Sequence, residues 1–123
     1  MLLVYSDDAT LEALREAPHE DACLAACEGL VDDLAEGGRY VGAGILQPTS
    51  TATSVRIREG RRIVTDGPFA ETREQLAGYL IVDAENLDDA IAVAARHPVA
   101  QSGTLEVRPL MYVPFLDKAK ATV

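Results

Sequence analysis

Two strand–helix–strand patterns, separated by a hairpin pattern, constrain this chain more than any other feature of its sequence. The first runs from an apolar strand at Met1–Tyr5, through a helix, to a strand at Arg39–Leu46. The second runs from Gly78–Asp83, through another helix, to Thr104–Leu110. Two such units fold into one antiparallel sheet with both helices on one face. The predicted class is therefore α+β, a ferredoxin-like split βαβ fold with an inserted β-hairpin.

The spacing of apolar residues places the two helices. The first is predicted from Asp21 to Glu36 and ends at Gly37-Gly38, because glycine adopts the left-handed conformation that follows many helices. Its predicted buried face comprises Cys23, Cys27, Leu30, Val31 and Leu34. The second helix begins after Asn86, a favourable N-cap, and ends before Pro98. Its predicted buried face comprises Leu87, Ala90, Ile91 and Ala94.

The hairpin pattern lies between the two units. Apolar residues alternate with arginines over residues 55–58, Glu59-Gly60 supplies the turn, and Arg61–Thr65 forms the returning strand. We expect one apolar and one arginine-rich face. Asp66-Gly67-Pro68 then predicts a chain reversal, and Phe69–Leu76 a connecting loop.

One face of the predicted sheet has no helix to cover it. Gly42 and Gly44 leave space along one strand face, which another backbone or a ligand would fill. The segment Met111–Leu116 is apolar, which is unusual for a free chain end. We therefore expect a homodimer whose second subunit covers the bare face. Residues 1–116 are predicted to form one domain, and residues 117–123 a frayed tail.

The charge balance limits the classes of partner. The formal net charge is −9, which repels polyanions and argues against direct nucleic-acid binding. Residues 53–65 nevertheless carry a net charge of +3, either as a solvated hairpin or as an anion-attracting rim. No apolar run approaches the ~20 residues that span a bilayer, and no signal peptide precedes the first strand. We expect a cytoplasmic protein without membrane contact.

The two cysteines, Cys23 and Cys27, lie four residues apart on the first helix. A metal or redox pair would suit this spacing, but no third or fourth ligand lies nearby in the sequence. Sparse cysteine is typical of proteins in a reducing compartment, where cysteine is often buried. We expect both thiols to be reduced and buried, with no metal and no cofactor.

The segment Thr65–Tyr79, TDGPFAETREQLAGY, resembles the DGPF-type branch of the YCII-related family. The segments LLVY, LQPTSTATSVRI, GYLIVDAENLDDAI and GTLEVRP follow in the family's order. The resemblance implies a bacterial protein of the dimeric α/β barrel superfamily, without a known reaction. Members are often encoded beside, or fused to, extracytoplasmic-function sigma factors. Related proteins carry a proposed His–Asp pair, whose histidine position falls at about Cys27 here, with His19 as a possible substitute.

Two titratable residues are candidates for catalysis. Asp66 would act as a general base if desolvation raised its pKa, or would instead hold the Gly67-Pro68 turn by accepting backbone hydrogen bonds. His97 titrates near neutral pH and lies at the end of the second helix. It would act as an acid–base group, or as a cation that stabilises the helix C-terminus.

Four further residues are candidates for ligand binding: Tyr5, Phe69, Tyr79 and Arg108. Two classes of function fit this set. The first is a small-molecule enzyme or binder with an apolar pocket on the inter-sheet face of the dimer. The second is a non-catalytic accessory or regulatory protein that binds a protein partner, such as a sigma factor.

Overall fold

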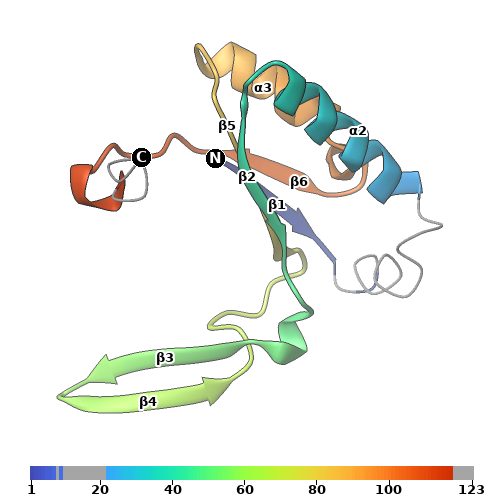
Figure 1. The fold of residues 1–123 in the computed structure, drawn as a ribbon. Helices are drawn as coiled ribbons and strands as arrows, with labels where there is room; N and C mark the ends of the chain where they lie inside the picture. The colour runs from blue at the N-terminus through green and yellow to red at the C-terminus, as the bar shows by residue number, and fades with distance from the viewer. Residues whose placement is uncertain (8, 10–21, 118–123) are drawn as a thin grey trace.

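A computed structural model describes residues 1–7, 9 and 22–117 of the chain. Four strands form one antiparallel sheet in the order β2–β5–β1–β6. Their bounds are Leu2–Ser6 for β1, Tyr40–Ile45 for β2, Gln75–Val82 for β5 and Thr104–Val107 for β6. Helices α2 (Ala22–Glu36) and α3 (Leu87–Arg96) both cover one face of this sheet (Figure 1). The predicted α+β class and ferredoxin-like strand order are confirmed, and the dimeric barrel stays a prediction.

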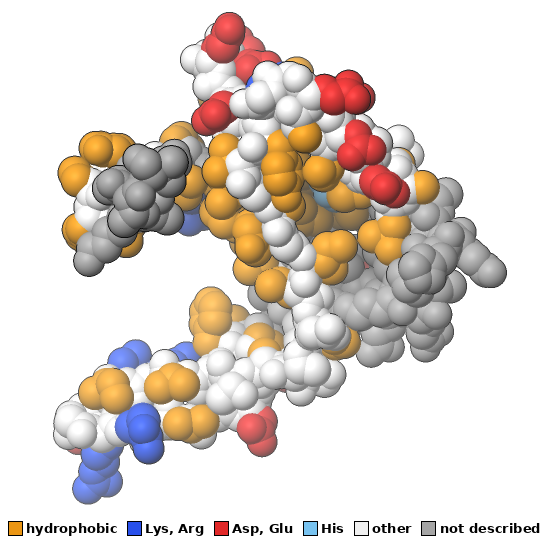
Figure 2. Space-filling model, in the orientation of Figure 1, with side chains coloured by type: hydrophobic (Ala, Val, Ile, Leu, Met, Phe, Trp, Pro, Cys, Tyr) orange, Lys and Arg blue, Asp and Glu red, His pale blue; other side chains and the backbone are white. Residues whose placement is uncertain are grey.

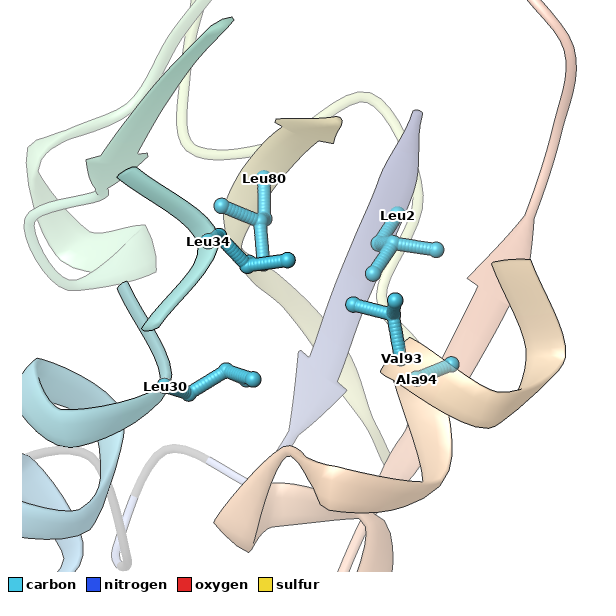
Figure 3. Packing of buried hydrophobic residues seen from close by; sticks show 6 residues of the cluster. All are labelled: Leu2, Leu30, Leu34, Leu80, Val93 and Ala94. Carbon is cyan, nitrogen blue, oxygen red and sulfur yellow. The ribbon is translucent and has the colours of Figure 1, made fainter. Parts of the chain in front are cut away.

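The core lies between the sheet and the two helices. Leu2 and Leu80 pair across β1 and β5, and both side chains face α2 and α3 (Figure 3). Leu30 and Leu34 of α2 close the core with exposures of 3% and 2%. Each fully buried leucine contributes on the order of 2 kcal/mol through the hydrophobic effect. These contacts fix α2 over the middle of the sheet.

Both predicted helix ends are confirmed. Gly38 ends α2 with φ of +69°, and the Arg39 amide donates to the Leu34 carbonyl at 2.8 Å. The Asn86 side chain accepts a hydrogen bond from the Asp89 amide at 2.9 Å and so caps α3. Asp89 also pairs with Arg39 at 2.8 Å, which ties the start of β2 to α3.

The predicted buried face of α3 is wrong by about one position on the helical wheel. Leu87 is 61% exposed and Ile91 is 48% exposed, whereas Val93 and Ala94 are buried. Two apolar stripes overlap on this helix, 87/90/91/94 and 90/93/94/97, and share two alanines. The second stripe faces the sheet, because it brings the end of α3 and the following residue, His97, into the interior.

Strands β3 (Thr53–Arg58) and β4 (Arg61–Asp66) form a separate two-stranded sheet. Residues 53–66, here called the arm, project away from the main body (Figure 1). Glu59 and Gly60 form the turn with φ of 51° and 74°. Positive φ at both central residues is usual in hairpins with a two-residue turn.

The two faces of the arm differ from the prediction at two residues of β4, Arg62 and Ile63. Ile57 lies directly opposite Arg62, and Arg56 lies opposite Ile63. Because opposite residues share a face, Arg62 joins the apolar side and Ile63 joins the arginine-rich side. The length of the turn is the reason, because a two-residue turn fixes which residue of β4 lies opposite each residue of β3.

Two strand boundaries also differ. Strand β5 begins at Gln75, inside the predicted loop, because Gln75 and Leu76 pair with the end of β1. Strand β6 ends at Val107, before Pro109, and lies at the sheet edge as the proline indicates. Short 3₁₀ helices occur at Thr49–Thr51 (η1), Pro98–Gln101 (η2) and Pro114–Asp117 (η3). In the part of the chain that is described, no helix has the length and apolarity to cross a membrane.

Candidate functional site

An apolar pocket of about 380 Å³ lies between α2, the sheet and η2. Figure 2 shows the apolar side chains that gather between the helices and the sheet. The pocket walls include Leu24 and Val31 from α2, Ile45 from the edge strand β2, and Leu80 and Val99. Among the described residues, four that line the pocket have polar side chains: Cys27, Glu28, Tyr79 and His97. A volume of this size with few polar groups is typical of small-molecule sites.

His97 is held in this pocket by the junction of two helices. It ends α3 in an extended conformation, with φ of −68° and ψ of 131°, which the following Pro98 favours. Its Nδ1 accepts a hydrogen bond from the Val99 amide at 3.1 Å and so caps η2. The side chain is only 8% exposed, and burial lowers the pKa of His97 below its ordinary value of 6.5.

The hydrogen bond to Nδ1 assigns the histidine tautomer. Since Nδ1 accepts a hydrogen bond from the Val99 amide, a neutral His97 carries its own proton on Nε2. That Nε2 lies 3.7 Å from the Sγ atom of Cys27, which belongs to α2. The imidazole is therefore a hydrogen-bond donor toward the thiol. The predicted cationic role at the helix end does not fit this buried, neutral group.

The contact between Cys27 and His97 joins residues that are 70 positions apart. The sequence singled out each residue separately but gave no sign that they meet. Cys27 is half-buried rather than buried as predicted. The side chain of Cys23, and His19 as a whole, lie outside the described residues. Among the residues described, no group of three or more histidine, cysteine, aspartate or glutamate side chains is arranged to hold a metal ion.

Three predicted ligand-binding residues lie on the sheet face away from the helices, here called the bare face. The Tyr5 hydroxyl donates to Glu106 Oε2 at 3.4 Å, and Arg108 pairs with Glu106 Oε1 at 2.5 Å. The hydrogen bond with Glu106 raises the pKa of Arg108, which therefore stays cationic. Tyr79 covers Gly44, where an added Cβ would lie 2.8 Å from the ring. The space predicted at Gly44 is thus filled by Tyr79 of the same chain.

Gly42 differs from Gly44, because an added Cβ at Gly42 would meet nothing within 4 Å. The space predicted along this strand is therefore open at one glycine only. The neighbour at Gly42 that the sequence predicted, a second backbone or a ligand, stays a prediction.

Asp66 ends β4 on the exposed arm and lies apart from His97. Within the described residues, its carboxylate accepts no hydrogen bond. The chain reversal is held instead by the Gly67 amide, which donates to the Ala52 carbonyl at 2.8 Å, and by Ser54 Oγ, which donates to the Gly67 carbonyl at 2.8 Å. The hydrogen bonds of this turn that the described residues show therefore come from Gly67, Ala52 and Ser54.

Phe69 is 80% exposed and lines a second hollow, of about 630 Å³, at the base of the arm. Tyr5 contributes to the wall of the same hollow, together with Pro68 and Leu76. Asp66 lines neither hollow. The structure thus groups Tyr5 with Phe69, places His97 elsewhere with Cys27, and does not bring Asp66 to either group.

Comparison with known proteins identifies the family of this chain. The family model of the YCII-related domain matches residues 1–114. An uncharacterized protein of Rhizobium meliloti (strain 1021) is 34% identical over 116 residues, which cover 92% of this chain and 93% of that protein. The chain therefore belongs to the YCII-related family.

Proposed function

We propose that this protein binds a small, largely apolar molecule in the pocket lined by Cys27 and His97. The observation that carries the proposal is a neutral, buried imidazole whose Nε2 proton points at a thiol within apolar walls. An apolar cavity with a few convergent polar groups is the usual form of a ligand site. The described lining residues come from α2, the sheet and η2 of one chain.

The polar groups of the pocket select the chemical class of the ligand. His97 offers one N–H donor, and the thiol of Cys27 is a weak donor and a weak acceptor. Among the described residues, no arginine or lysine lines the pocket, and Glu28 contributes a carboxylate. An anionic ligand would lose its hydration without a cationic partner, which is unfavourable. A neutral molecule with a carbonyl, ether or phenol oxygen fits best.

Binding is favoured over acid–base catalysis by the hydrogen bonds of His97. A general base needs a free lone pair, but Nδ1 already accepts from Val99 and Nε2 bears the proton. A pocket between the sheets of a dimer, with Tyr5, Tyr79 and Arg108, is a second location for a ligand. There the Arg108 guanidinium is already paired with Glu106. An accessory or regulatory role, for example with a sigma factor as partner, is the alternative and requires no ligand in either place.

A spectroscopic screen tests the proposal. Small neutral carbonyl and phenol compounds would be titrated into ¹⁵N-labelled protein while the amide signals of Cys27 and Val99 are followed. Ala43 lines the pocket from β2, so Ala43→Phe should fill it and weaken binding by at least about tenfold. Ala35→Phe is the matched control, because Ala35 is exposed on α2 and does not line the pocket. Equal binding by both variants, or no saturable shift with any compound, would refute the proposal.

A further inference from the structure

The thiol of Cys27 gives the ligand pocket a nucleophile. Cys27 lies on α2, is half-buried and forms part of the pocket wall. Its sulfur is not in a disulfide. Cysteine is intrinsically very nucleophilic among protein side chains, even where only a few per cent of it is ionised. A molecule held in this pocket therefore lies next to a group that can form a covalent bond with it.

His97 places a fixed hydrogen-bond donor beside this thiol. Its side chain is only 8% exposed, and the Val99 amide holds its Nδ1 at 3.1 Å. The Nε2 proton points into the pocket, where Nε2 lies 3.7 Å from Sγ of Cys27. Sulfur is a weak hydrogen-bond acceptor, whereas a carbonyl oxygen is a strong one. A ligand with a carbonyl oxygen would therefore replace the sulfur as the acceptor for this proton.

The spacing of the donor and the thiol selects an α,β-unsaturated carbonyl compound. In such a compound, the carbonyl oxygen and the β-carbon lie at the two ends of one O=C–C=C unit. The oxygen needs to lie about 2.9 Å from His97 Nε2 for a hydrogen bond. The β-carbon needs to lie about 3–3.5 Å from Cys27 Sγ for attack. Both contacts can form at once because Nε2 and Sγ are 3.7 Å apart, and the apolar walls accommodate the hydrocarbon part.

We propose that Cys27 captures a neutral α,β-unsaturated carbonyl compound by conjugate addition, an inference that rests on the ligand pocket proposed above. The sulfur forms a bond to the β-carbon while the C=C π bond breaks, and an electron pair moves onto the carbonyl oxygen as an enolate. The thiol proton passes to water, and water returns a proton to the α-carbon. The product is a thioether of Cys27. No group leaves, and no oxidant or reductant is needed.

The Nε2 proton of His97 makes this addition selective. Glu28 lines the same pocket, and its carboxylate disfavours a negative charge on the thiol of the preceding residue. During the addition, the negative charge develops on the carbonyl oxygen instead. A fixed donor in an apolar site stabilises such a charge strongly. Cys27 should therefore react fastest with compounds that accept the hydrogen bond from His97.

Cyclohexenone, with the saturated cyclohexanone as its matched control, tests the inference on the full chain. Intact mass spectrometry should show one cyclohexenone added per chain, and peptide mapping should place it on Cys27. The rate should level off at high cyclohexenone concentration, since addition follows binding in the pocket. It should exceed the rate for the same thiol in the urea-unfolded chain by at least about tenfold, because the pocket orients the reacting atoms.

Variants separate the pocket from the hydrogen-bond donor. Ala43→Phe fills the pocket but keeps Cys27 and His97, so it should slow the addition by at least about tenfold. Ala35→Phe, on the exposed side of α2, should leave the rate unchanged. His97→Asn keeps an acceptor for the Val99 amide but has no donor at the position of Nε2, so it should also slow the addition by about tenfold or more.

The outcomes distinguish failure of the covalent step from failure of the pocket. Saturable binding of cyclohexanone without addition of cyclohexenone to Cys27 would overturn the inference and leave the pocket as a ligand site. Addition that maps to Cys23, rises linearly with cyclohexenone concentration or is equally fast in Ala43→Phe would also overturn it, because no bound state would then precede the reaction. Neither addition of cyclohexenone nor saturable binding of any compound in the screen would overturn both proposals.

Discussion

Replacing His97 tests how the pocket is built, because this buried side chain accepts a hydrogen bond from the Val99 amide. His97→Ala would leave the buried Val99 amide without an acceptor, which costs about 1–3 kcal/mol. Removing a ring that is only 8% exposed adds a cavity, so the total loss should be about 2–4 kcal/mol. His97→Asn keeps an oxygen near the position of Nδ1 and should lose about half as much.

The pH dependence of the unfolding free energy distinguishes the contribution of the His97 imidazole from that of the other residues. Burial lowers the pKa of His97 in the folded state, so the unfolded state binds a proton more readily. Stability contributed by neutral His97 is therefore complete above the unfolded pKa of 6.5, and it falls as the pH drops from there toward the lower folded pKa. The slope for one proton reaches at most about 1.4 kcal/mol per pH unit.

Urea unfolding of the wild type and His97→Asn between pH 7.5 and 5 measures this effect. The difference in unfolding free energy should shrink as the pH falls, because the asparagine does not titrate while the carboxylates are common to both proteins. A constant difference across this range, or one that grows on acidification, would refute the assignment of a buried neutral imidazole.

Three further predictions concern glycine packing, the arm and the core. Gly44→Ala should lower the unfolding free energy by about 1–3 kcal/mol, because the added Cβ would lie 2.8 Å from the Tyr79 ring. Gly42→Ala should change the unfolding free energy of the monomer far less, because its added Cβ meets nothing within 4 Å. Equal losses for the two variants in calorimetry would contradict this prediction. Asp66→Ala should change thermal stability by less than about 0.5 kcal/mol, because the described residues give its carboxylate no hydrogen bond to lose. A loss of 1–2 kcal/mol would restore its predicted role in the turn. Leu34→Ala, at a site 2% exposed, should lose about 2–5 kcal/mol in urea unfolding, and a loss below 1 kcal/mol would be inconsistent with the core in Figure 3.

The fold could be predicted from the sequence where local chemistry determines local structure. Asn86 caps α3 and Gly38 ends α2, because both depend on backbone geometry within a few residues. The strand order also followed, since two strand–helix–strand units around a hairpin have few alternatives. The buried face of α3 could not be predicted, because two apolar stripes share Ala90 and Ala94 and only the sheet decides between them.

The candidate site was less predictable than the fold for a similar reason. Cys27 and His97 each lay on a predicted element, but their contact depends on how α2 packs against η2. The choice between a helix-end cation and a buried neutral imidazole depends on burial, which comes from the same packing. Asp66 was singled out because it lies in a motif, but a motif can reflect a structural turn as well as a functional site.

The Cys27–His97 pair also bears on how this chain relates to its family. By resemblance, related proteins have a histidine at about position 27, as one member of a proposed His–Asp pair. Here an imidazole from another part of the chain lies next to position 27, since His97 Nε2 lies 3.7 Å from Cys27 Sγ. Its other nitrogen accepts a hydrogen bond from the Val99 amide, and burial lowers the pKa of His97. The binding role proposed above follows from this arrangement, because a neutral imidazole with its proton on Nε2 offers a ligand a hydrogen-bond donor.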